Sequence, residues 1–186
     1  MKRLCSLLFL LIFNTTGCGT ETDLEASSGI ENQKKEVVEQ NNQMPKVVPN
    51  DFDFMVRFGY GEVTKNEINT YQDTVTKDLI MKGTAKANIT FTTEEIRSIY
   101  EKMREINVFG MKELVPTNMN CSSIPYNEES WKISVAGEIK TITWSDKNCD
   151  VTSDAKKLLE LRTFIQQIVA GKDAYKQLPK AEGGYE

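Results

Sequence analysis

From position 51 the chain alternates polar and apolar residues with a period of two, the pattern of a β-strand with one buried face. The apolar set of this run is Phe52, Phe54, Val56, Phe58 and Tyr60. Shorter and more polar stretches follow, and they predict two strands between positions 67 and 81 with a turn near Gln72. Renewed alternation over 87–91 predicts a fourth strand.

The clearest element is a hairpin over 131–144. Two alternating runs flank Gly137 and Glu138, and a glycine at the first loop position favours a two-residue type II′ turn. That register would place Trp131 opposite Trp144, and Ile133 opposite Ile142, on one face of the sheet. We expect this aromatic pair to stabilise the sheet.

Two segments have helical periodicity. The first begins at Thr92, where Thr92 and Glu95 fit a capping box ahead of an apolar stripe. The second begins near Asp154, the expected cap, and ends at about position 170, before Gly171. A long loop over 110–130 separates the first helix from the hairpin. This order of strands and helices along the chain predicts an α+β fold, an antiparallel sheet of about six strands with two helices packed on one face.

The N-terminal segment has the layout of a bacterial export signal. A short basic end precedes an apolar run over 4–13, which is shorter than the roughly 20 residues that a membrane span needs. Small residues then lead to Gly17 and Cys18. This junction resembles the lipobox of bacterial lipoproteins, in which the cysteine is diacylated and begins the mature protein, although Thr15 stands where leucine is usual. We expect residues 1–17 to be a lipoprotein signal peptide and Cys18 to be lipidated; an ordinary secretory signal cut nearby is the alternative.

Residues 18–50 comprise the expected lipidated cysteine and an acidic tether. The tether is rich in Glu, Asn, Gln and Ser and has no aromatic residue, so it cannot bury enough apolar surface to offset its ordering entropy. It would span roughly 30 Å as a flexible coil and roughly 110 Å fully extended. Residues 51–186 remain as a single globular domain with a short C-terminal tail. We therefore expect a protein on the extracytoplasmic face of the cell membrane. The lipid at Cys18 would attach it to that membrane.

Charge and composition exclude several classes of function. The chain has 23 basic and 27 acidic residues, a formal net charge of −4 and no basic cluster, which argues against a nucleic-acid partner. It has no histidine, which removes Ser-His-Asp and Cys-His catalysis and His-ligated zinc. No glycine-rich phosphate loop occurs. We expect no catalytic residue, no metal site and no cofactor.

Cys121 and Cys149 are the cysteines that remain in the expected exported domain. Two cysteines in an oxidising compartment are expected to pair, and the bridge would tie the long loop to the turn before the last helix. The alternative is a catalytic thiol, for which the chain offers no histidine as a base.

The run Asn66-Glu67-Ile68-Asn69-Thr70-Tyr71, followed by Thr76-Lys77-Asp78, is similar to a pattern in uncharacterised lipoproteins of Bacillus-like bacteria, some carried on prophages. The expected signal, tether and domain agree with that family, which implies no established activity. We expect a non-enzymatic binding or interaction module with a protein or envelope partner. The alternative is a cell-wall or carbohydrate hydrolase with paired carboxylates. The candidate carboxylates are Asp73, Asp78, Glu94, Glu95, Asp146 and Asp150.

Overall fold

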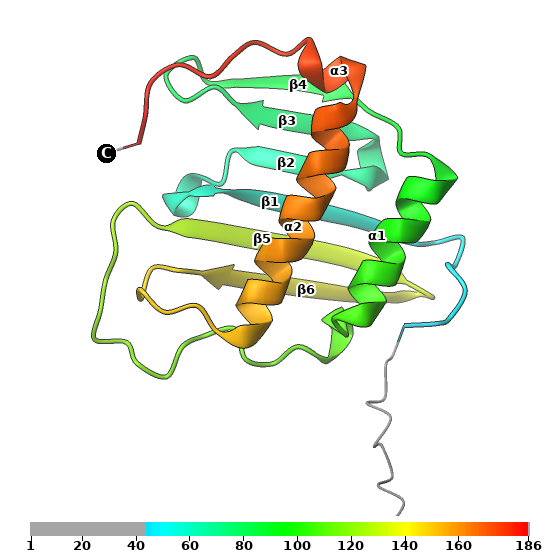
Figure 1. The fold of residues 1–186 in the computed structure, drawn as a ribbon, viewed down its shortest axis with the longest axis horizontal. Coiled ribbons are helices and arrows are strands. Elements are labelled where there is room, and N and C mark those ends of the chain that lie inside the picture. Colours follow the sequence, from blue (N-terminus) through cyan, green and yellow to red (C-terminus); the bar gives the residue numbers. More distant parts are fainter. Residues whose placement is uncertain (1–43, 186) are drawn as a thin grey trace, which may run out of the picture. The chain divides into compact units, whose positions relative to one another are not determined.

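The structure is a computed structural model that describes residues 44–185, so the expected signal peptide and Cys18 lie outside the described residues. The described chain forms a six-stranded antiparallel sheet with three α-helices, which confirms the predicted α+β class (Figure 1). The strands are β1 (Asp53–Tyr60), β2 (Asn66–Asn69), β3 (Thr74–Asp78), β4 (Thr84–Asn88), β5 (Asn127–Val135) and β6 (Glu138–Ser145). The helices are α1 (Thr93–Glu105), α2 (Ser153–Gly171) and α3 (Asp173–Lys176).

The sheet and two of the helices form two layers with the core between them. The strand order is β4-β3-β2-β1-β5-β6, and α1 and α2 cross the same face of this sheet (Figure 1). Alternate residues of β1 and β5 meet the helix stripe, and burying each such side chain contributes about 1.5–3 kcal/mol. The fully buried set includes Phe54, Val56, Trp131, Ile133, Ile99, Leu158, Leu161 and Ile165.

Both long helices begin at a threonine cap. Thr92 Oγ1 accepts a hydrogen bond from the Glu95 backbone N–H at 3.2 Å, and Glu95 Oε2 accepts one from the Thr92 N–H at 2.7 Å, so the predicted capping box is present. The cap of α2 is Thr152 rather than the expected Asp154. The Asp154 carboxylate instead accepts hydrogen bonds from the backbone of Lys112 and Glu113 and so holds the start of the long loop.

The hairpin register differs from the predicted one by two residues. Trp131 pairs with Ile142, and Trp144 pairs with Glu129. The turn is Ala136-Gly137, with φ values of 51° and 81°, and positive φ at both positions is what a type I′ turn requires. The side chain of Asp51 accepts hydrogen bonds from both turn amides, at 3.0 and 2.6 Å, and this distant contact favours the observed turn. A slip of two residues leaves every side chain on its predicted face.

The long loop is shorter than predicted, because β5 begins at Asn127. The strand thus includes residues 127–130, which the weak sequence periodicity had assigned to the loop. Among them, Glu129 points to the helix-covered side, since it lies two residues before the buried Trp131.

Residues 44–50, which composition assigned to the tether, pack against the domain. The Met44 side chain is only 2% exposed. Tyr100 Oη donates to the Pro45 carbonyl oxygen at 2.9 Å, and Arg104 Nε donates to the Met44 carbonyl oxygen at 3.1 Å. This segment is therefore part of the folded domain, because α1 supplies the apolar and polar partners that its own sequence lacks.

Candidate functional site

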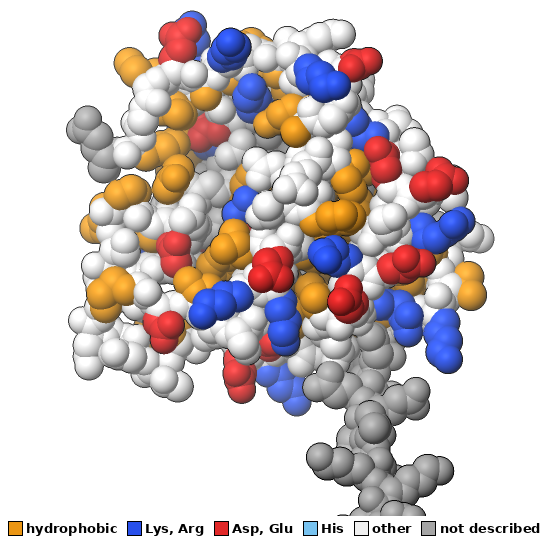
Figure 2. Space-filling model, viewed as in Figure 1, with side chains coloured by type: hydrophobic (Ala, Val, Ile, Leu, Met, Phe, Trp, Pro, Cys, Tyr) orange, Lys and Arg blue, Asp and Glu red, His pale blue; other side chains and the backbone are white. Residues whose placement is uncertain are grey.

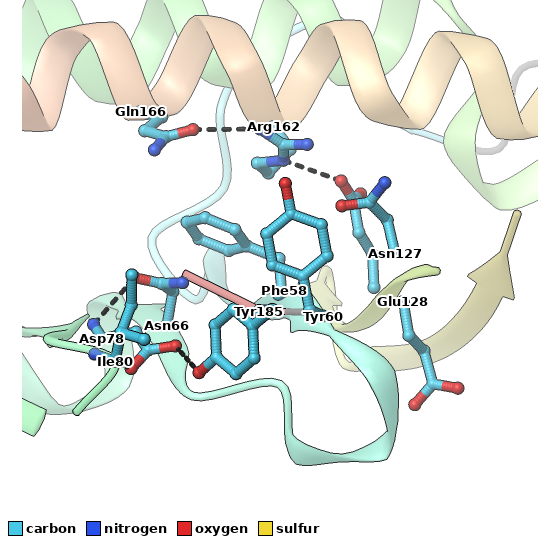
Figure 3. Close-up of a pocket in the computed structure, with 12 residues that line it drawn as sticks. Phe58, Tyr60, Asn66, Asp78, Ile80, Asn127, Glu128, Arg162, Gln166 and Tyr185 are labelled. Carbon is cyan, nitrogen blue, oxygen red and sulfur yellow. Dashed lines mark hydrogen bonds and ion pairs between the residues drawn. The ribbon is translucent and has the colours of Figure 1, made fainter. Parts of the chain in front are cut away.

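A pocket of about 380 Å³ lies at the end of the sheet where β1 and β3 end and β5 begins. Residues of α2 and of the C-terminal tail complete its walls (Figure 3). The lining is Phe58, Gly59, Tyr60, Asn66, Asp78, Ile80, Asn127, Glu128, Glu129, Arg162, Gln166 and Tyr185. Three of the lining residues are aromatic, Phe58, Tyr60 and Tyr185, and most of the others have polar side chains.

The deep wall of the pocket is built on Glu129, whose residue surface is 1% exposed. Its Oε1 accepts a hydrogen bond from Arg162 Nε at 2.7 Å. Its Oε2 accepts hydrogen bonds from the indole nitrogens of Trp131 at 3.3 Å and Trp144 at 3.1 Å. Three donors therefore hold one carboxylate, and a buried charge is tolerated only with such partners.

Burial raises the pKa of Glu129, against the opposing effects of the Arg162 charge and the hydrogen bonds from Arg162 and both tryptophans. Arg162 is itself held in place. Its Nη1 donates to Gln166 Oε1 at 3.0 Å, and its guanidinium lies 5.0 Å from the centroid of the Phe58 ring. The hydrogen bonds among Glu129, Arg162, Gln166 and the two tryptophans therefore satisfy the polar groups of this wall from within the protein.

The outer rim is built on Asp78 and Tyr185. Tyr185 Oη donates a hydrogen bond to Asp78 Oδ2, and Lys65 Nζ donates one to Tyr185 Oη at 3.2 Å. The hydrogen bond to Asp78 is the main cause that raises the pKa of Tyr185. The Tyr185 ring contacts the ring of Tyr60, which is 45% exposed, at a centroid distance of 5.3 Å. This rim reaches solvent, in contrast to the deep wall.

Of the six carboxylates named as hydrolase candidates, Asp78 alone lines this pocket. Glu95 belongs to the capping box and to an ion pair with Lys172 at 2.7 Å, and Asp146 accepts hydrogen bonds from Asn127. The pocket brings Asp78 together with Glu128 and Glu129 instead. Asp78 already accepts hydrogen bonds from Tyr185 Oη and from the Ile80 backbone N–H, so both buried carboxylates of the pocket are occupied.

Cys121 and Cys149 lie at disulfide distance, with their Sγ atoms 1.98 Å apart and their Cα atoms 5.7 Å apart. The bridge joins the long loop to the turn before α2, as expected from their positions. A hydrogen bond from the Ser123 backbone N–H to the Lys147 carbonyl oxygen at 2.7 Å reinforces this link. The pinned loop leads directly into Asn127 and thus into the pocket wall.

Glu129 and Arg162 were missed by the sequence analysis, although each leaves a signal. Glu129 lies two residues before Trp131, so the alternation of β5 places it on the same buried face as Trp131, Ile133 and Val135. A glutamate at such a position needs a partner for its charge. Arg162 lies four residues after the buried Leu158 and three before the buried Ile165, so it borders the buried stripe of α2. A carboxylate and a guanidinium at core-facing positions of two elements predict a buried ion pair.

Within residues 44–185 there is no group of three or more Cys, Asp or Glu side chains placed to hold a metal ion. None of the described helices is long and apolar enough to cross a membrane. Searches of protein-family models, of curated proteins and of solved structures found no significant match to this chain.

Proposed function

We propose that this chain is a lipoprotein anchored through Cys18 to the extracytoplasmic face of the cell membrane, whose domain is a non-enzymatic binding module. The anchoring part of the proposal rests on the export-type signal that ends at Cys18. The observation that carries the binding module is the division of the pocket into a deep wall, whose polar groups bond one another, and an accessible rim. Because Arg162 and two indoles already hold Glu129, the deep wall supports shape rather than proton transfer. Recognition would then take place at the rim.

Exposed apolar side chains at the same end of the sheet support this proposal. Tyr60 ends β1, Val63 follows it, Met81 follows β3 and Ile124 precedes β5, and all four are exposed. Figure 2 shows apolar side chains gathered on the left of the view, at this end of the sheet, while acidic and basic side chains are intermixed over the helix-covered face. Exposed apolar side chains gathered at one end of a molecule are typical of an interaction surface.

One specific observation favours the alternative of a carbohydrate or cell-wall hydrolase. Asp78, Glu128 and Glu129 line a single pocket, and glycoside hydrolysis uses two carboxylates that face each other across such a space. Release of soluble fragments from cell-wall material by the purified chain, lost in Asp78→Asn, would favour this alternative over the binding module.

The test of the proposal joins anchoring and binding in intact cells. Metabolic labelling with a fatty acid should mark the wild-type chain and not Cys18→Ser, because one lipid group attaches to the thiol and its two acyl chains hold the protein in the membrane. A photo-crosslinking amino acid at position 60 should capture a partner, whereas the same group at the exposed position 141 on the other face of the sheet should not. An unlabelled wild-type chain, or equal capture at both positions, would contradict the proposal.

A further inference from the structure

The C-terminal tail lies in an extended conformation beside the segment that joins β3 to β4 (Figure 1). Glu182 and Ile80 form a parallel bridge. The Met81 backbone N–H donates to the Glu182 carbonyl oxygen at 3.1 Å, and the Glu182 N–H donates to the Leu79 carbonyl oxygen at 3.3 Å. A single bridge thus pairs the tail with the β3–β4 connection, through the same backbone hydrogen bonds by which a sheet edge binds an extended peptide.

Tyr185, a few residues further along the tail, is contacted at its hydroxyl group and at its ring. Its hydroxyl group donates to Asp78 and accepts from Lys65, so both hydrogen-bonding capacities of a phenol are met. The Tyr60 ring contacts the Tyr185 ring, and Lys65 Nζ lies 5.4 Å from the Tyr185 ring centroid. Figure 3 shows the two tyrosine rings side by side, with the Tyr185 hydroxyl directed at Asp78.

The tail is held to this site by few and exposed contacts. Residues 180–184 are exposed along their whole length. The ion pair of Lys82 and Glu182 has side chains that are 55% and 60% exposed, and pairs of this kind contribute little. Gly183 and Gly184 connect the paired backbone to the anchored Tyr185, and glycine has the largest conformational freedom to regain on release. Apart from Tyr185, the contacts that hold the tail are therefore made by exposed residues, where water can replace them.

We infer that this surface is a peptide-binding groove, that residues 180–185 occupy it as a displaceable internal ligand, and that its partner is an extended peptide bearing a tyrosine. The partner's backbone would pair with residues 79–81, and its phenol would enter the subsite formed by Tyr60, Lys65 and Asp78. This inference rests on the proposed function and names its ligand class. A partner must compete with the tail, whose tethered effective concentration is on the order of millimolar.

The test uses the full chain and a fluorescently labelled, amidated peptide Lys-Ala-Glu-Gly-Gly-Tyr, the sequence of residues 180–185. The receptor is the double variant Glu182→Pro with Tyr185→Ala, which removes the pairing N–H and the ring of the internal ligand. Fluorescence anisotropy should show the peptide bound at least about tenfold more tightly by this variant than by the wild-type chain, because the tail no longer competes.

A matched peptide with phenylalanine in place of tyrosine tests the subsite without altering the protein. It should bind the double variant about tenfold more weakly, or worse, since the Asp78 carboxylate and the Lys65 ammonium lose their shared hydroxyl partner. Equal binding of the two peptides, equal binding by variant and wild type, or no binding to the variant would each overturn the inference. If a partner were nevertheless crosslinked at position 60 in cells, the peptide inference would be wrong, but the proposed binding module would remain supported with another class of ligand.

Discussion

The deep wall and the rim of the pocket each place a buried carboxylate near a cation, but the partners of the two carboxylates differ in exposure. At the wall, Glu129 is almost completely buried and the side chain of Arg162 is 17% exposed. At the rim, Lys65 reaches Asp78 only through the hydroxyl of Tyr185, a residue of the exposed tail. Removing a partner from a buried pair leaves an uncompensated charge in the protein, whereas water can replace a partner at an exposed site. The wall is therefore expected to govern stability and the rim to govern binding.

The sharpest test of this contrast is Glu129→Ala. The change should lower the free energy of unfolding by about 3–5 kcal/mol, because it leaves the Arg162 guanidinium and two indole N–H groups buried without their acceptor. Urea denaturation followed by tryptophan fluorescence measures the loss.

Two matched variants serve as controls for Glu129→Ala. The neighbouring Glu128→Ala, on the opposite face of β5, should change stability by less than about 0.5 kcal/mol, and Tyr185→Phe at the rim by less than about 1 kcal/mol. If Glu129→Ala lowered the free energy of unfolding no more than Glu128→Ala does, the deep wall would not be the part of the pocket that stabilises the fold.

The next effect in size concerns the loop that leads into the wall. Replacing Cys121 and Cys149 together by serine should lower the free energy of unfolding by about 2–4 kcal/mol, because the bridge closes a loop with a sequence separation of 28. Amide hydrogen exchange should then rise over residues 111–126 while β6 and both long helices stay protected. An unchanged melting temperature after reduction of the wild-type chain would contradict this expectation.

The smallest expected effect is a difference in pH dependence between two glutamates. Burial, the largest influence, raises the pKa of Glu129 above its ordinary value of 4.5, so its contribution to stability is full below pH 4.5 and declines as the pH rises through the raised pKa. At Glu95, burial is outweighed by hydrogen bonds from Lys172 and the Thr92 backbone, which lower the pKa, so its contribution is present above pH 4.5 and is lost as the pH falls.

Thermal unfolding across pH 3–8 in the variants Glu129→Gln and Glu95→Gln measures this difference. The advantage of the wild-type chain over Glu129→Gln should shrink with rising pH, and its advantage over Glu95→Gln should grow. Parallel trends for the two variants would mean that the Arg162 charge, rather than burial, dominates at Glu129.

The elements whose signals are local could be predicted from the sequence. Alternation over 51–60 and 131–144 identified β1 and the hairpin, and the Thr92 and Glu95 pair identified the start of α1. These signals suffice because side-chain periodicity and caps depend on residues within a few positions of one another. The Cys121–Cys149 pairing was also predicted, since few cysteines leave few combinations.

Local patterns thus predicted the strands, the capping box of α1 and the α+β class, whereas the cap of α2, the hairpin register and the site depend on contacts between distant segments. Asp51, which lies far from the turn in sequence, favours Ala136-Gly137 as the turn. Glu129 meets Arg162 across 33 positions, and Asp78 meets Tyr185 across 107. Contacts between residues so far apart in sequence depend on how the helices and the tail pack against the sheet. The periodic pattern of a single segment carries no information about that packing.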